Sequence, residues 1–135
     1  MEFKVVTPHG VIYEDDIEQV SVPTVAGDIV ILQNHAPIVS VLRPGELVAT
    51  KKDAVVSMAV AGGILEVRET GEVYIMADAA ERAEHIDLDR AEAARQRAEE
   101  LMKQKDHMQN VDFARLQAKI EKELARITVG KKYRG

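Results

Sequence analysis

Basic side chains recur at helical spacing in the last third of the chain. Arg90 and Arg97 are seven residues apart, so one helix would place them on the same face. A second helix would carry a stripe of cations at intervals of four, three and four residues: Arg115, Lys119, Lys122 and Arg126. If the two helices close into a hairpin, arginines from both converge. Converging guanidinium groups bind polyphosphate through bidentate, charge-assisted hydrogen bonds.

Acidic side chains near these cations leave two interpretations open. Glu81 and Asp87 precede the first arginine and are placed to accept a hydrogen bond from the exocyclic amine of a nucleobase. The alternative is a pair of solvated helix faces whose charges form ion pairs four residues apart, such as Lys119 with Glu123. Spacing alone favours the solvated faces, so a nucleotide site needs further support.

The other residues that could catalyse a reaction or hold a metal lack the spacing that either requires. The histidines have no ligand neighbour at metal spacing and are expected in turns or at the surface: His9, His35, His85 and His107. No serine lies in a Gly-x-Ser-x-Gly elbow. Gly130-Lys131 is not a phosphate loop, because the required upstream glycine is Ala125. Gly62-Gly63 precedes a strand, which indicates close backbone packing. The sequence therefore predicts a protein that is not an enzyme.

Composition and charge limit the class of protein. The 135 residues are 46% hydrophobic and 30% charged, which is typical of a globular chain. Only 4% are aromatic, which argues against a base-stacking nucleic-acid module. Residues 1–80 carry 5 basic and 12 acidic side chains and residues 81–135 carry 13 and 11, so the net charge of -5 divides into -7 and +2. This asymmetry predicts two parts with different partners.

No segment has the pattern of a signal peptide or of a membrane span. The first residues lack a basic region followed by an apolar core. The longest nearly apolar run, residues 54–65, is far shorter than the ~20 residues that a spanning helix needs. Cysteine is absent, which excludes disulfides and a cysteine nucleophile. Membrane association is therefore expected only through a protein partner.

The elements that would position the cations are preceded by a long β region. Short apolar and β-branched segments, separated by glycine, proline and asparagine, predict strands at residues 3–7, 11–13, 17–22, 29–32, 38–42, 46–50, 54–61, 64–68 and 73–77. Strands at this spacing predict an antiparallel sandwich or barrel. Several strands are apolar at both alternating positions, so parts of both faces are covered, and this favours the sandwich.

The hydrophobic period becomes helical at Asp87, which is a good N-cap candidate. One helical face then collects Leu88, Ala91, Ala94, Ala98, Leu101 and Met102. Residues 104–110 are polar and predict a break, and a second helix is predicted over residues 112–127 and ended by Gly130. The apolar seam of this second helix is Phe113, Leu116, Ile120, Leu124 and Ile127.

These patterns predict an α+β chain in two domains. An N-terminal antiparallel β-sandwich occupies residues 1–84, and a C-terminal two-helix antiparallel hairpin occupies residues 85–135. One seam of the hairpin is rich in alanine and buries little surface, so the hairpin is expected to be marginally fixed and able to dock in more than one place.

Five segments together resemble the epsilon subunit of bacterial F-type ATP synthase over essentially the whole chain. They are Val5-Val6-Thr7-Pro8, GDIVILQNHAP at 27–37, GGILEV at 62–67, AAERAE at 79–84 and IDLDRA at 86–91. The last segment fits the I/L-D-x-x-R-A nucleotide motif of the family. One such hexamer is weak support, but the ordered set on a sandwich followed by a helical hairpin is specific.

The resemblance implies a regulatory and rotor-coupling subunit. In the family, the sandwich binds the gamma subunit and touches the membrane c-ring, which assigns the c-ring contact here to Asp28 and His35. The hairpin blocks ATP hydrolysis when it extends along gamma into the alpha/beta catalytic head, and it permits activity when it folds onto the sandwich. The implied location is the cytoplasmic face of the bacterial plasma membrane, peripheral and held by the complex. No nucleic-acid partner is expected.

The resemblance also implies ATP as a regulatory ligand. In several bacilli-type members ATP binds the folded hairpin and is not hydrolysed, and Mg²⁺ is a candidate companion of the nucleotide. By position, the ATP contacts fall at Glu81, Ile86, Asp87, Arg90, Ala91, Arg97, Lys122 and Arg126. Lys122 stands where the family has an arginine, which keeps the charge but loses the planar fork. Two alternatives remain: a stand-alone nucleotide-sensing module that uses the same hairpin, and a weak ATPase.

Overall fold

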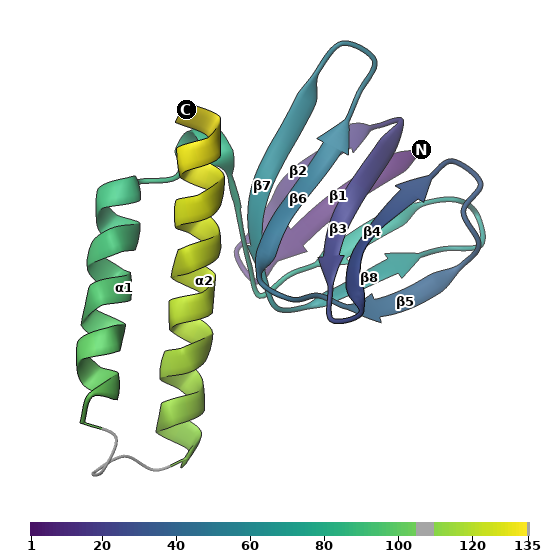
Figure 1. Cartoon of the computed structure of the whole chain (residues 1–135). Coiled ribbons are helices and arrows are strands. Elements are labelled where there is room, and N and C mark those ends of the chain that lie inside the picture. Colours follow the sequence, from purple (N-terminus) through teal and green to yellow (C-terminus); the bar gives the residue numbers. More distant parts are fainter. Residues whose placement is uncertain (105–109, 135) are drawn as a thin grey trace.

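The computed structural model describes residues 1–104 and 110–134. Its N-terminal part forms two five-stranded sheets, ordered β2-β1-β9-β8-β5 (the first sheet) and β10-β7-β6-β3-β4 (the second sheet) (Figure 1). The strands are β1 (Glu2–Thr7), β2 (Gly10–Asp16), β3 (Gln19–Thr24), β4 (Gly27–Leu32), β5 (Ile38–Val41), β6 (Gly45–Thr50), β7 (Val55–Ala61), β8 (Ile64–Val67), β9 (Val73–Met76) and β10 (Ala79–Arg82). The predicted fold class, a β-sandwich followed by two helices, is confirmed.

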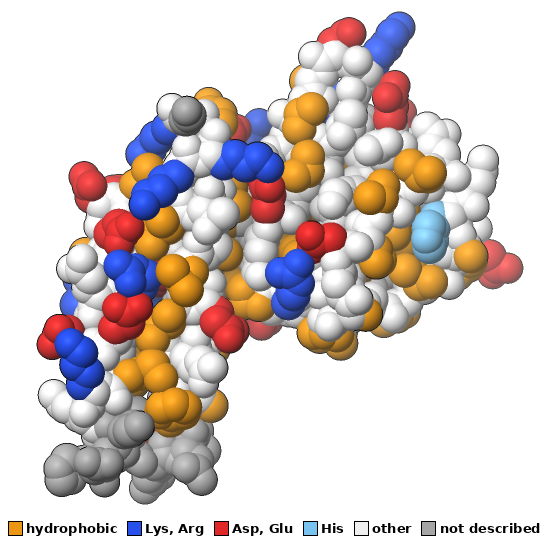
Figure 2. All heavy atoms as spheres, viewed as in Figure 1, with side chains coloured by type: hydrophobic (Ala, Val, Ile, Leu, Met, Phe, Trp, Pro, Cys, Tyr) orange, Lys and Arg blue, Asp and Glu red, His pale blue; other side chains and the backbone are white. Residues whose placement is uncertain are grey.

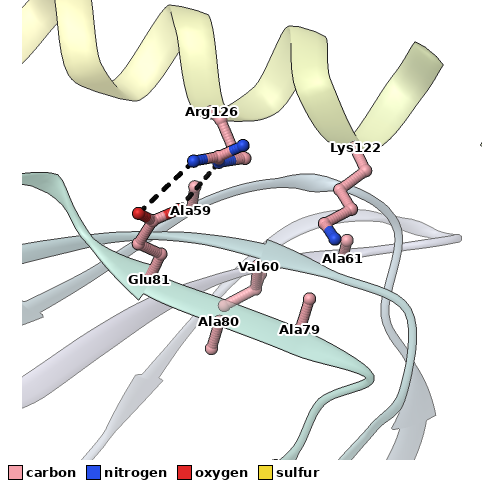
Figure 3. Close-up of a pocket in the computed structure, with 8 residues that line it drawn as sticks. All are labelled: Ala59, Val60, Ala61, Ala79, Ala80, Glu81, Lys122 and Arg126. Carbon is pink, nitrogen blue, oxygen red and sulfur yellow. Dashed lines mark hydrogen bonds and ion pairs between the residues drawn. The ribbon is translucent and has the colours of Figure 1, made fainter. Parts of the chain in front are cut away.

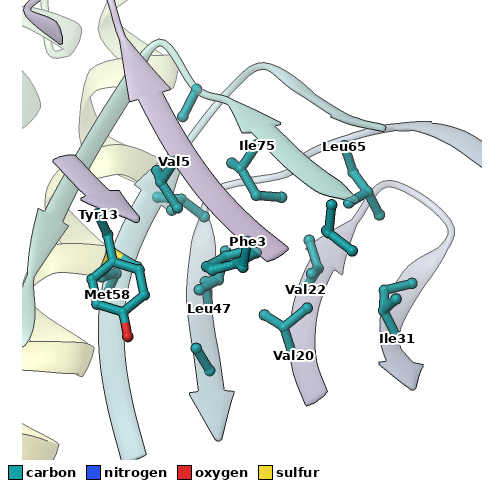
Figure 4. Packing of buried hydrophobic residues seen from close by; sticks show 14 of the residues in the cluster. Phe3, Val5, Tyr13, Val20, Val22, Ile31, Leu47, Met58, Leu65 and Ile75 are labelled. Carbon is teal, nitrogen blue, oxygen red and sulfur yellow. The ribbon is translucent and has the colours of Figure 1, made fainter. Parts of the chain in front are cut away.

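One alternating face of each sheet forms the core. Phe3 and Val5 of β1 are buried, whereas Lys4 and Val6 are partly exposed on the other face. Figure 4 shows side chains of the first sheet packed against side chains of the second, among them Val22 and Leu47. Full burial of such a side chain stabilises the fold by about 1.5–3 kcal/mol. Alternate residues of β1 therefore face the core and the outer surface in turn.

Three details of the sheets differ from the prediction. β1 and β9 pair in parallel, so the sandwich is not wholly antiparallel. β10 was not predicted, because its alanines and charged residues are poor strand formers; pairing with β7 holds it at the edge of the second sheet. β3 continues through Pro23, although the strand was predicted to stop there. The ladder to β6 ends at Ser21, so no β6 residue requires the missing N–H of the proline.

Two helices follow the sandwich: α1 (Leu88–Met102) and α2 (Asn110–Arg134). Asp87 is confirmed as the N-cap of α1, because its backbone is extended and its carboxylate accepts the N–H of Arg90 at 3.1 Å. The predicted end of the second helix was wrong, since α2 runs through Gly130. This glycine makes a close contact, and a Cβ on it would lie 2.7 Å from Cδ2 of Leu88. The predicted break lies largely outside the described residues, as does His107.

α2 lies between α1 and the sandwich (Figure 1). It contacts β6 and β7 of the second sheet and the short 3₁₀ turn η1 (Ala83–His85) that precedes α1. The predicted apolar seams were wrong at Leu101 and Leu124, which are 49% and 45% exposed. α2 instead buries Ala125 and Val129 in addition to the predicted Ile127. Because α2 has two partners, its buried surface is not the single seam of a two-helix contact.

Candidate functional site

A basic groove lies between the two helices. It is about 540 Å³ in volume and is lined by Arg90, Ala93, Ala94, Arg97, Lys119, Lys122, Glu123 and Arg126. α1 supplies two of its cations and α2 supplies three, because the antiparallel hairpin brings the two predicted basic faces together. The small side chains Ala93 and Ala94 leave room between the cations. The groove can therefore surround a polyanion with guanidinium and ammonium donors.

Arg126 holds two carboxylates at the edge of this groove. Its Nε donates to Oε2 of Glu81 at 2.7 Å, and its Nη1 donates to Oε2 of Glu123 at 2.8 Å. Burial lowers the pKa of Arg126, but the hydrogen bonds and charges of Glu81 and Glu123 outweigh burial and raise the pKa overall. The contact with Glu81 links α2 to β10, so Arg126 joins the hairpin to the sandwich (Figure 3).

A second cleft, about 300 Å³ in volume, adjoins the basic groove on the sandwich side of α2. Lys122 and Arg126 line both cavities, and both side chains extend from α2 toward β7 and β10 (Figure 3). Small residues of the two strands form the floor of the cleft: Ala59, Val60, Ala61, Ala79 and Ala80. Glu81 stands at one end of this floor, within reach of Arg126. The two cavities together offer an apolar surface next to a cluster of cations.

The structure brings together five of the eight residues assigned to ATP. Glu81, Arg90, Arg97, Lys122 and Arg126 line one or both cavities. In the part of the chain that the structure describes, Arg90, Arg97 and Lys122 form no ion pair, so their charges remain available to a ligand.

The remaining three residues do not line either cavity. Ile86 is buried in a small cluster with Val129, and its carbonyl accepts from Nη2 of Arg134 at 2.7 Å. Ala91 is fully buried. Asp87 is exposed at the start of α1, where its carboxylate is already used as the helix cap. In this arrangement these residues fix the start of α1 rather than face a ligand.

Asp28 lies at the start of β4 and His35 lies beyond its other end, so the structure does not bring the two predicted c-ring contacts together. Asp28 forms an ion pair with Arg43 and lines a groove between the second sheet and α2. His35 lies beyond the other end of the strand, where its Nδ1 is 2.7 Å from the carbonyl oxygen of Ala36.

Sequence reasoning missed the burial of Glu123. The predicted pair with Lys119 is present, with a separation of 4.0 Å, but the carboxylate is only 2% exposed and is not part of a solvated face. Its position three residues before Arg126 and four after Lys119 put it on the basic stripe. Spacing could therefore identify the face of the helix but not its burial. Gly62-Gly63 is confirmed as a close backbone contact, since a Cβ on Gly63 would lie 2.0 Å from the carbonyl oxygen of Met76.

The donor set of the groove does not suit a metal held by the protein. Among residues 1–104 and 110–134 there is no group of three or more histidine or carboxylate side chains placed to hold an ion. Glu123, the carboxylate that lines the groove, is already paired with Arg126, and the remaining charged groups are cations. Mg²⁺ therefore has no protein ligands here.

None of the described helices has the length and hydropathy needed to cross a membrane.

The chain combines a β-sandwich with a helical hairpin that packs on its second sheet, and a basic groove lies between the two helices. Residues 1–83 match the family described as ATP synthase, Delta/Epsilon chain, beta-sandwich domain, and residues 84–131 match its long alpha-helix domain. The chain therefore belongs to the delta/epsilon chain family of ATP synthase, as a non-catalytic epsilon-type subunit of the bacterial F-type enzyme.

Individual relatives agree with this assignment. The chain is 40% identical over 129 residues to the ATP synthase epsilon chain of Halalkalibacterium halodurans, which covers 96% of both chains. It is 52% identical over 101 residues to the epsilon chain of Bacillus subtilis, covering 74% of this chain and 75% of the relative. A chain in the mitochondrial ATP synthase of Euglena gracilis has a similar fold, with a TM-score of 0.72 at 20% identity, covering 88% of this chain and 74% of that one.

Proposed function

We propose that this chain is a regulatory and rotor-coupling subunit of a proton-translocating F-type ATP synthase, whose hairpin responds to ATP. The observation that supports ATP sensing is the basic groove, because its cations come from both helices. The groove is complete only while the hairpin is closed. A polyphosphate bound there favours the closed hairpin by its differential affinity for that state.

The contacts that dock the hairpin suit a switch. Arg126 reaches Glu81 of β10, and Nζ of Lys132 donates to Glu46 of β6 at 2.9 Å. The accompanying apolar cluster is small: Ala59, Ala83, Ile86 and Val129, with Leu88 packed against it. Because polar contacts and a small cluster hold the hairpin, a ligand that adds about 1.4 kcal/mol at ten times its dissociation constant would bias its position. In the proposed cycle, release of the hairpin lets it reach the alpha/beta subunits and block ATP hydrolysis.

The lining of the groove favours binding of ATP without its hydrolysis. The described residues around it are cations, alanines and one carboxylate, and that carboxylate is hydrogen-bonded to Arg126. A cationic lining holds phosphates, but hydrolysis also needs a free base to activate water. The role proposed for ATP is therefore that of a regulatory ligand.

An apolar row crosses the outer face of the first sheet and would suit a rotor contact. The strand registers place exposed Val41 beside Ile64, Ile64 beside Met76, and Met76 beside Val6. Val6 pairs with exposed Val11, which extends the row to β2. α2 contacts the second sheet, so this row lies on the opposite side of the sandwich. A continuous exposed apolar surface of this kind marks a protein contact.

We assign this row to the gamma subunit and keep Asp28 and His35 as proposed c-ring contacts. Over the face visible in Figure 2, acidic and basic side chains are interspersed on the hairpin beside apolar ones, and further apolar side chains lie on the sandwich. The net charges of the two parts, -7 for residues 1–80 and +2 for residues 81–135, suit different partners. Membrane association, on the cytoplasmic face of the plasma membrane, would come through the assembled complex.

Calorimetric titration of the purified chain with ATP tests the proposed site. Arg90→Ala and Arg97→Ala are expected to weaken binding, because both side chains line the basic groove, while leaving the far-ultraviolet spectrum of the chain intact. Unchanged affinity in both variants would refute the assignment. Co-purification with a membrane-bound ATPase tests the rotor role, and its absence would favour a stand-alone nucleotide sensor. Phosphate release from the purified chain with Mg-ATP would contradict a purely regulatory ligand.

A further inference from the structure

One carboxylate lies inside the basic groove. The Glu123 side chain is 2% exposed, and its Oε2 accepts from Nη1 of Arg126 at 2.8 Å. Its other oxygen lies 4.0 Å from Nζ of Lys119. Arg90, Arg97 and Lys122 line the same groove. Glu123 is thus an internal anion surrounded by the cations that would receive a ligand.

A buried carboxylate in this position has two opposing effects. It compensates the repulsion among the five cations that line the groove, and in return those cations stabilise its charge. It also occupies a donor of Arg126, which is already hydrogen-bonded to Glu81 through Nε. A polyphosphate that enters the groove must displace Glu123 from Arg126 or approach a like charge. Either course lowers the affinity of the groove for the polyphosphate.

We propose that Glu123 is a built-in competitor for the polyphosphate position and lowers the affinity of the groove for ATP. The inference rests on the proposed function and extends it, because Glu123 sets the concentration range to which the hairpin responds. Because the Glu123 carboxylate offsets part of the repulsion among the cations of the groove, the hairpin can close without nucleotide. A stronger response to ATP is prevented by the same carboxylate.

A purely structural ion pair would behave differently from a competitor. Loss of a structural pair would loosen the hairpin and weaken ligand binding, or leave binding unchanged. Loss of a competitor strengthens binding even if the hairpin becomes less stable. The affinity for polyanions therefore separates the two roles by its direction.

The test compares Glu123→Gln with Glu121→Gln in the full-length chain. Glutamine retains the size of the side chain and a hydrogen-bond acceptor for Arg126. Glu121 lies two residues earlier on α2, is exposed, and lines the separate groove that faces the second sheet. Both variants change the net charge equally, but only Glu123→Gln removes charge from the basic groove. Glu123→Ala is a second variant if the glutamine variant does not fold.

Calorimetric titrations use ATP and inorganic tripolyphosphate at two salt concentrations. Glu123→Gln is expected to bind both ligands roughly tenfold more tightly than the wild type, because a like charge is removed from a partly dehydrated groove. Glu121→Gln is expected to stay within about twofold of the wild type.

The outcomes separate this inference from the proposed function. If the wild type binds ATP and Glu123→Gln binds it equally or more weakly, Glu123 is not a competitor, while the ATP site stands. If only Glu123→Gln binds, the competitor role stands and ATP sensing by the wild type fails. If neither chain binds ATP or tripolyphosphate, both ideas fail. An equal gain in Glu121→Gln would also overturn the inference, since net charge alone would explain it.

Discussion

Replacement of Arg126 by methionine is expected to release the hairpin from the sandwich. Methionine retains an unbranched apolar stem but removes the hydrogen bonds to Glu81 and Glu123. The two carboxylates then face different environments. Glu81 is 30% exposed and can be hydrated, whereas Glu123 is 2% exposed and keeps only Lys119, at 4.0 Å.

The magnitude follows from this difference in burial. Breaking a buried ion pair by removal of one partner costs about 3–5 kcal/mol. Because Lys119 remains near Glu123, the expected loss for Arg126→Met is at the lower end, about 3 kcal/mol. Glu81→Gln leaves the pair between Arg126 and Glu123 in place, so its expected loss is about 1 kcal/mol.

Native-state hydrogen exchange can measure these losses, because it gives a free energy of opening for each amide. Arg126→Met is expected to lower the opening free energies of the amides of α2 that face the second sheet. Amides of β1, β8 and β9 should keep their wild-type values. Arg95→Met is a matched control, since Arg95 pairs with Glu92 and Glu99 of its own helix. It should leave the docking of the hairpin unchanged.

Equal losses in Arg126→Met and Glu81→Gln would refute the reasoning, because they would show that Glu123 does not depend on Arg126. A further arm uses the double variant Arg126→Met/Glu123→Leu. Leucine removes the stranded charge, so the double variant is expected to recover much of the lost stability. Failure to recover would mean that contacts of the arginine other than its ion pairs hold α2 in place.

Substitutions elsewhere test packing, pH dependence and the outer face. Gly130→Leu is expected to cost about 1–3 kcal/mol in thermal unfolding, because even a Cβ would lie 2.7 Å from Cδ2 of Leu88, and Leu88→Ala should restore part of that loss. The hydrogen bond from Lys51 lowers the pKa of Asp15 below its usual 3.8, so this carboxylate stabilises the fold above that value and loses the contribution as pH falls through the folded pKa. Lys51→Gln should therefore flatten the acid side of the pH–stability curve. Val41→Asp is expected to reduce co-purification with the synthase while leaving ATP affinity unchanged.

The sequence was sufficient where one residue and its near neighbours decide the structure. The apolar and β-branched residues at 3–7 predicted the first strand, and β1 forms there with Phe3 and Val5 buried. Asp87 was identified as an N-cap because the chain becomes helical immediately after it. The spacing of Arg90 and Arg97 placed them on one face, and closure of the hairpin brought that face to the stripe of α2.

Features that depend on contact between distant segments could not be predicted. β10 forms because β7 offers it a partner, although its own residues disfavour a strand. Gly130 looked like a helix end, but it is retained inside α2 where Leu88 approaches it closely. Leu124 fits a two-helix seam, yet it is exposed because α2 also packs on a sheet. The burial of Glu123 also depends on distant segments. Periodicity shows which face of α2 carries this side chain, but the packing of the hairpin determines whether that face is covered.

The proposed switch needs a physical reason for ATP to prefer the closed hairpin, and the composition of the groove supplies one. A ligand moves a two-state equilibrium only by its differential affinity for the two states. Arg90 and Arg97 belong to α1 and Arg126 belongs to α2, so an opened hairpin separates the donors that a polyphosphate bridges. Closure without ligand brings these cations together against their mutual repulsion, which Glu123 offsets only in part. Bound polyphosphate removes that repulsion, so the stabilisation of the closed hairpin by ATP should weaken as the salt concentration is raised. If that stabilisation did not depend on salt, the preference of ATP for the closed hairpin would have to come from the second cleft, whose floor is formed by small residues of β7 and β10.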